Sequence, residues 1–103
     1  MQILDRNRQP LDVGDRVRLR SIGPHGPQEL TGTIKALYDR PEAVTLTLDE
    51  PTNVYDAQLG GLIRREKGED LYVTLRGRVH GDGAFVCLEH NDHYGGLLFA
   101  EKL

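Results

Sequence analysis

The stretch Leu30-Thr-Gly-Thr-Ile34 decides the fold, together with Val44-Thr-Leu-Thr-Leu48 and Gly60-Gly-Leu-Ile63 after it, because a similar pattern returns later in the chain. The second copy reads Leu75-Arg-Gly-Arg-Val79, Ala84-Phe-Val-Cys-Leu88 and Gly95-Gly-Leu-Leu98. Each copy predicts a strand, a turn, a second strand, a Gly-Gly pair and a third strand. We therefore expect two related β units, residues 13–65 and 69–103, the second a shortened partial copy of the first.

Strict alternation of apolar and polar residues supports strands in both units. In Val44-Thr-Leu-Thr-Leu48 the apolar residues share one face and the threonines share the other. In residues 16–21, Val17 and Leu19 are expected to face the core, and three arginines the opposite side. Gly32 indicates a bend or bulge. Since no long amphipathic helix is visible, the sequence predicts an all-β fold, either a small barrel or strongly bent antiparallel sheets.

The length of 103 residues predicts one domain, residues 1–103, with a single modest core. Residues 1–12 are expected to add one short edge strand and little to that core. No apolar run approaches the roughly 18 residues that cross a bilayer, and no secretion signal is visible, so we expect no membrane association. Cys87 is the only cysteine and cannot form an intrachain disulfide, which suits a reducing cytoplasm.

The arginines of the first strand form the main charged feature. The net charge of −3 argues against a protein that coats nucleic acid non-specifically, but it leaves room for a local basic face. Arg16, Arg18 and Arg20 lie on one face, roughly 6.6 Å apart, which is close to a nucleotide step in an extended strand. Two interpretations stay open: an anionic partner, or cross-strand ion pairs with Asp and Glu. Stacking platforms for bases would come from the tyrosines, with Tyr72 on an outer face: Tyr38, Tyr55, Tyr72 and Tyr94.

A family resemblance starts at a Gly-Asp turn. Val13-Gly-Asp-Arg-Val-Arg-Leu-Arg20, with Gly23-Pro and Leu30-Thr-Gly-Thr-Ile34 after it, resembles the opening of a KOW motif or a related SH3-like barrel. The resemblance covers about twenty residues. It implies an SH3-like fold, and KOW-type domains often bind RNA or transcription proteins. It would place partner binding on the arginine face and on the loop that contains His25.

A second candidate site lies near the end of the chain. Cys87, His90 and His93, with His80 upstream, offer ligands that suit zinc. Coordination would need the chain to turn directly after Leu88, because Cys87 and His90 would point to opposite faces of a continuing strand. The alternative is a buried structural cysteine beside solvated histidines.

The catalytic patterns are absent or incomplete. Ser21 is the only serine and has no evident base beside it, so the sequence favours no enzymatic class. The segment 95–100 carries no charge, and we expect it either to pair within the sheet or to mediate homo-oligomerisation. The favoured interpretation is a non-enzymatic binding or adaptor module that recognises a protein or peptide through an open sheet face and the loops 23–29 and 89–96. A nucleic-acid-binding KOW-like domain and a small metal-dependent protein are the alternatives.

Overall fold

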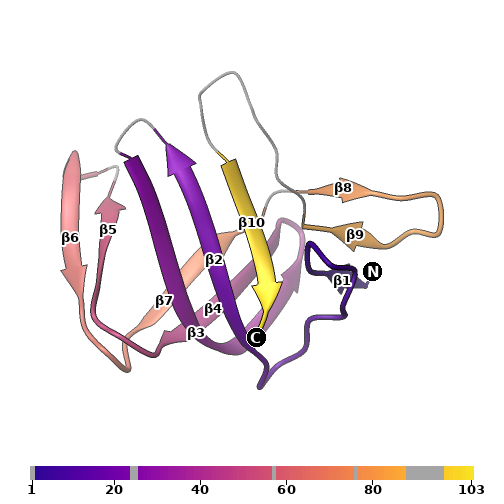
Figure 1. Ribbon diagram of the computed structural model, residues 1–103, viewed down its shortest axis with the longest axis horizontal. Helices are drawn as coiled ribbons and strands as arrows, with labels where there is room; N and C mark the ends of the chain where they lie inside the picture. The colour runs from indigo at the N-terminus through magenta and orange to yellow at the C-terminus, as the bar shows by residue number, and fades with distance from the viewer. Residues whose placement is uncertain (1, 24–25, 57, 76, 88–96) are drawn as a thin grey trace.

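Strands make up all the regular structure of the described residues (Figure 1). The structure, a computed structural model, describes residues 2–23, 26–56, 58–75, 77–87 and 97–103. The predicted all-β class is confirmed. The strands are β1 (Ile3–Leu4), β2 (Arg16–Gly23), β3 (Gly26–Asp39), β4 (Glu42–Leu48), β5 (Thr52–Asp56), β6 (Gly61–Arg65), β7 (Asp70–Thr74), β8 (Arg78–Val79), β9 (Phe85–Val86) and β10 (Leu97–Lys102).

These strands form three sheets rather than a closed barrel. The main sheet is antiparallel throughout, in the order β10-β2-β3-β4-β7. A second sheet is the hairpin β5–β6, and the third has the order β1-β9-β8 with β1 parallel to β9. Among the described residues no sheet closes on itself, because β10 and β7 end the main sheet without pairing with each other. Figure 1 shows β10, β2 and β3 side by side, with β4 and β7 crossing behind them.

The long strand β3 holds the two halves of the main sheet together. Its first half pairs with β2 up to Thr33, and its second half pairs with β4 from Gly32 onward, so only these two residues have pairing partners on both neighbouring strands. A Cβ on Gly32 would lie 2.5 Å from the backbone oxygen of Thr47, so the close approach of β4 requires glycine. The bulge predicted near Gly32 lies further along, between Ile34 and Ala36, and it leaves Lys35 unpaired in the ladder.

The core lies against one face of this bent sheet, as the alternation predicted. Val17 and Leu19 are 0% and 2% exposed, while their arginine neighbours are half-buried or exposed. On β4 the same pattern buries the apolar residues and leaves the threonines half-buried on the other face. The buried cluster joins residues from six strands and from three flanking segments: Ile3, Leu11, Val17, Leu19, Leu30, Ile34, Val44, Leu46, Leu48, Leu75, Phe85, Cys87 and Ala100.

The first residues contribute more to the core than the sequence predicted. The N-terminal hook, residues 3–11, supplies β1 as the expected edge strand, and it buries Ile3, Leu4 and Leu11. Its anchor is Asp5, which is 0% exposed. The carboxylate of Asp5 accepts hydrogen bonds from the backbone N–H groups of Asn7, Gln9 and Lys102, each at 2.8 Å. The hook is therefore tied directly to β10.

The two sequence copies form similar hairpins in different sheets. The first copy gives β3–β4 in the main sheet, and the second gives the short pair β8–β9. Gly77 corresponds to Gly32 in the pattern and has a similar role, since a Cβ there would lie 2.1 Å from the oxygen of Val86. The third strands differ, because β6 pairs with β5 while β10 pairs with β2. Since β7 and β10 also bond to strands of the first unit, both units share one sheet.

Candidate functional site

The candidate site is the outer face, defined as the side of the main sheet opposite the core. Alternation along five paired strands brings polar and aromatic side chains together on it. The described residues of the outer face are Arg16, Arg18 and Arg20 on β2, Glu29, Thr31, Thr33, Ala36 and Tyr38 on β3, Ala43, Thr45 and Thr47 on β4, Asp70, Tyr72 and Thr74 on β7, and Glu101 on β10.

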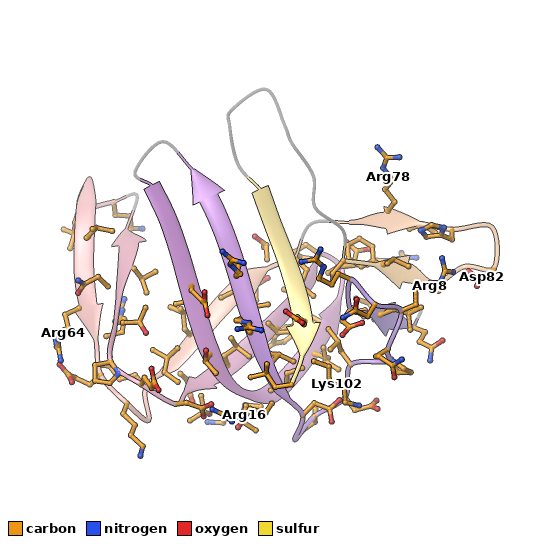
Figure 2. All side chains as sticks on the ribbon, viewed as in Figure 1. Arg8, Arg16, Arg64, Arg78, Asp82 and Lys102 are labelled. Atoms are coloured by element: carbon orange, nitrogen blue, oxygen red, sulfur yellow. The ribbon has the colours of Figure 1, made fainter. Side chains whose placement is uncertain are left out.

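The predicted arginine stripe is present, and each arginine has an acidic partner. Arg16 donates from Nε to Oδ2 of Asp49 at 2.7 Å. This hydrogen bond and the charge of Asp49 raise the pKa of Arg16. Arg16 lies at the start of β2, at the end of the sheet where Lys102 also lies (Figure 2).

The other two arginines share acidic partners across the strands. Arg18 lies 3.2 Å from Glu101 on β10 and 3.7 Å from Glu29 on β3. Arg20 lies 3.5 Å from the second carboxylate oxygen of Glu29. The ion pairs that the sequence left open as an alternative are thus observed, and the three positive charges of the stripe are balanced by Asp49, Glu29 and Glu101. An anionic partner would either have to displace these carboxylates from the arginines or bind close to their negative charges.

Two tyrosines form an exposed aromatic pair at the β7 end of the outer face. The side chains of Tyr38 and Tyr72 are 41% and 53% exposed, and their ring centroids lie 5.5 Å apart at an interplanar angle of 58°. They flank β4, where the small side chains of Ala43 and Thr45 leave room for the rings to meet. The hydroxyls of Tyr38 and Thr45 are hydrogen-bonded at 3.1 Å. The sequence placed Tyr72 on an outer face, but it gave no signal for this pairing with Tyr38.

An ion pair lies beside the tyrosines. Lys35, at the bulge of β3, donates to Oδ2 of Asp70, and the hydroxyl of Thr47 donates to Oδ1 of Asp70 at 2.8 Å. These two hydrogen bonds, the one from Lys35 first, lower the pKa of Asp70 below its ordinary value. The hydrogen bond to Asp70, and then its charge, raise the pKa of Lys35. Two hydrogen bonds therefore hold the side chain of Asp70, the first residue of β7, and favour its ionised form.

The free edge of β7 completes the candidate site. Leu48 N–H donates to the oxygen of Glu69, and Leu75 N–H donates to that of Glu42. In an antiparallel pair of strands, every second residue forms hydrogen bonds to the neighbouring strand. Since Glu69 and Leu75 bond to the β4 side, the odd-numbered residues from 69 to 75 are the ones that bond to it. The backbone N–H and C=O groups of Asp70, Tyr72 and Thr74 therefore point away from β4. No strand among the described residues pairs with this side of β7.

The opposite edge of the sheet is covered at the C-terminal end of β10. On β10, Lys102 N–H donates to Asp5, and the oxygen of Ala100 accepts a hydrogen bond of 2.9 Å from Arg6 N–H. The segment 97–102 itself pairs with β2, which is one of the two outcomes expected for the final strand. The two ends of the sheet thus differ: the last residues of β10 bond to the hook, whereas β7 has no strand on its outward side among the described residues.

The predicted metal site is described only at Cys87. His90 and His93 lie outside the described residues, and so does His25 of the predicted partner-binding loop. Cys87 is 1% exposed, and burial, followed by the charges of Asp5 and Glu42, raises the pKa of its thiol to about 12. Such a thiol stays protonated, whereas zinc binds the thiolate. Within the described part of the chain, no three His, Cys, Asp or Glu side chains gather as metal ligands, and the zinc site stays a prediction.

Comparisons with known proteins add no relative to this picture. No family model, curated protein or solved structure matches the chain. Over the described residues, the structure contains no helix with the length and apolar character needed to span a membrane.

Proposed function

We propose that this chain is a non-enzymatic protein-binding module in which an extended segment of a protein partner adds to the open edge of β7. The observation that carries the proposal is the outward edge of Asp70, Tyr72 and Thr74, which no described strand pairs with and which lies beside the exposed rings of Tyr38 and Tyr72. Strand addition supplies main-chain hydrogen bonds for affinity, and the alternate side chains of the added strand supply specificity.

The tyrosine pair suits the side-chain part of this recognition. Tyrosine combines a large apolar ring with a hydroxyl and is enriched among the residues that dominate protein interfaces. An added strand would place every second side chain on the outer face. The side chain directly opposite Tyr72 would have its Cβ about 5 Å from the Cβ of Tyr72. The Lys35–Asp70 ion pair lies at the first residue of β7 and would favour a polar group of the added strand opposite Asp70, away from the position opposite Tyr72. Apolar or aromatic side chains next to Tyr72 are therefore the expected signature of the partner.

The proposal includes the SH3-like character and the cytoplasmic location. The shared, bent strand β3, with β2 on one half and β4 on the other, supports an open relative of SH3-like barrels. The free, buried thiol of Cys87 suits a reducing compartment. The nucleic-acid alternative has less support, because each arginine of the stripe already has an acidic partner.

A peptide selection tests the proposed function. A library of displayed linear peptides would be selected on the dilute wild-type chain and counter-selected on Thr74→Pro. Proline at position 74 removes an outward N–H and keeps the bonds to β4, so the variant is expected to fold. We expect peptides that bind the wild type, lose binding to Thr74→Pro and Tyr72→Ala, and perturb the amide signals of residues 70–74. Peptides that bind both proteins equally would contradict the proposal, and so would the absence of selected peptides from a chain that also does not self-associate through β7.

A further inference from the structure

Resting on the proposed function, we propose that the strand added to β7 is β7 of a second copy of this chain. The two strands would run antiparallel around a two-fold axis at Tyr72. The two main sheets would then become one continuous sheet, in the order β10-β2-β3-β4-β7-β7-β4-β3-β2-β10.

The backbone selects this register. The outward-pointing groups belong to Asp70, Tyr72 and Thr74, which are spaced evenly around the centre of the strand. An antiparallel arrangement centred on Tyr72 places Asp70 opposite Thr74 of the second copy and Tyr72 opposite its own equivalent. Every opposed pair then brings two outward-pointing residues together, as a hydrogen-bonded antiparallel pair requires. A shift by two residues would leave one end of each strand without a strand residue opposite it.

The side chains are self-complementary in the same register. On the outer face, Tyr72 would meet its equivalent, which extends the Tyr38–Tyr72 pair into a row of four rings. The hydroxyl of Thr74 would face the Asp70 carboxylate of the second copy as a hydrogen-bond donor. On the inner face, Leu71 would lie opposite Val73, and both are half-buried against the core. No two like charges oppose each other anywhere along the strand.

The edge also lacks the usual protection against pairing. Edge strands that stay alone are commonly blunted by lysine, proline or a bulge. The segment Leu71-Tyr-Val-Thr-Leu75 has no charge, no proline and no bulge, and its residues favour strands. The edge of β10 in the same sheet is bonded to the N-terminal hook at Ala100 and Lys102. A strand of this composition, with no strand on its outward side among the described residues, fits a surface that pairs with its own copy.

The oligomeric state tests the proposal. Sedimentation velocity of the wild-type chain over a wide concentration range should show a reversible monomer–dimer equilibrium. In the dimer, the amide hydrogens of Tyr72 and Thr74 should exchange more slowly than in the monomer. Both measurements use the wild-type chain, so the test does not depend on the folding of a variant. A monomer at all concentrations, or a dimer in which these amides gain no protection, would overturn the proposal.

A charge swap tests the register. Tyr72→Lys and Tyr72→Glu each place like charges opposite each other in the dimer, and each should weaken dimerisation by roughly tenfold or more. An equimolar mixture of the two variants should regain the dimer as a heterodimer, because lysine would then face glutamate. Leu62→Lys is the matched control: Leu62 is also exposed, but it lies on the hairpin β5–β6, and this variant should dimerise as the wild type does.

The outcomes separate this inference from the proposed function. If Tyr72→Lys or Tyr72→Glu dimerises like the wild type, or if their mixture stays monomeric, the two-fold arrangement at Tyr72 is wrong. If the wild type stays monomeric while selected peptides bind at residues 70–74, the partner is a different protein. The inference then fails and the proposed function stands. If neither a second copy nor a peptide engages β7, both fail.

Discussion

The two edges of the main sheet have opposite designs. At the C-terminal end of β10, the buried carboxylate of Asp5 accepts a hydrogen bond from Lys102 N–H, and Arg6 N–H donates to the oxygen of Ala100, so two outward-pointing backbone groups have partners in the hook. At β7, the corresponding groups have no strand beside them among the described residues, and two exposed tyrosines lie next to them. Covering an edge is the ordinary way to prevent unwanted pairing. The difference supports our proposal that β7 is the edge at which a partner strand adds.

Removing the buried carboxylate should have the largest effect. In Asp5→Ala, the N–H groups of Asn7, Gln9 and Lys102 lose their acceptor, and we expect the free energy of unfolding to fall by about 4 kcal/mol. Denaturant unfolding measures this loss, and hydrogen exchange at Lys102 should speed up. Asp5→Asn keeps one acceptor oxygen and should lose less. A stability of Asp5→Ala equal to that of the wild type would refute the closure of β10 by Asp5.

A pair of adjacent prolines distinguishes the two sides of β7. Val73 N–H points toward β4, so Val73→Pro should lower the free energy of unfolding by about 3 kcal/mol. Thr74 N–H points outward, so Thr74→Pro should change stability by less than about 1 kcal/mol while abolishing partner binding. Thermal unfolding and binding of a selected peptide give the two readouts. Equal destabilisation by both prolines would show that the outward side is also bonded.

The small sheet β1-β9-β8, to which the hook belongs, can be weakened without changing a residue of β7. Gly77→Ala forces a Cβ against the oxygen of Val86, and we expect a loss of about 2 to 3 kcal/mol as β9, which pairs with β1, is displaced. Gly81→Ala is the control, because nothing lies within 4 Å of its Cβ position. Chemical denaturation compares the two variants. If Gly77→Ala proves as stable as Gly81→Ala, the close approach at Gly77 does not hold.

The smallest expected effect is a pH dependence at β7. The pKa of Asp70 is lowered from its ordinary value of 3.8, so the stabilisation it provides is complete above that value and is lost as the pH falls through the folded pKa. Because the ion pair is exposed, the loss should be slight. Asp70→Asn should make the acid limb of the stability curve shallower. Identical acid limbs for the two proteins would contradict the contribution of Asp70.

Local patterns predicted the strands well because alternation is a local property. Val17 and Leu19 on β2, and Val44, Leu46 and Leu48 on β4, are buried where the two-residue period placed them. The glycine signal was less specific, since Gly32 marks a close backbone approach and the bulge lies at Lys35. The barrel was only partly right: the sheets bend, but the main sheet does not close over the described residues.

The candidate site depends on which strands pair with one another, and local sequence patterns do not predict the pairing of strands that are distant in the chain. The arginine stripe was visible because its members alternate along one strand. The open edge of β7 depends on which strands lie beside it, and the pairing of Tyr38 with Tyr72 crosses a strand between them. In the sequence, Asp5 resembled an ordinary charged residue of a short edge segment. Its burial and its hydrogen bond with Lys102 N–H show that it anchors the hook to β10.

Amide hydrogen exchange of the dilute, monomeric chain tests the contrast between the edges most directly. We expect Tyr72 and Thr74 to exchange rapidly, Leu71 and Val73 to exchange slowly because they bond to β4, and Lys102 to exchange slowly because it bonds to Asp5. Slow exchange at Tyr72 and Thr74 in the monomer, or fast exchange at Lys102, would contradict the assignment of β7 as the open edge.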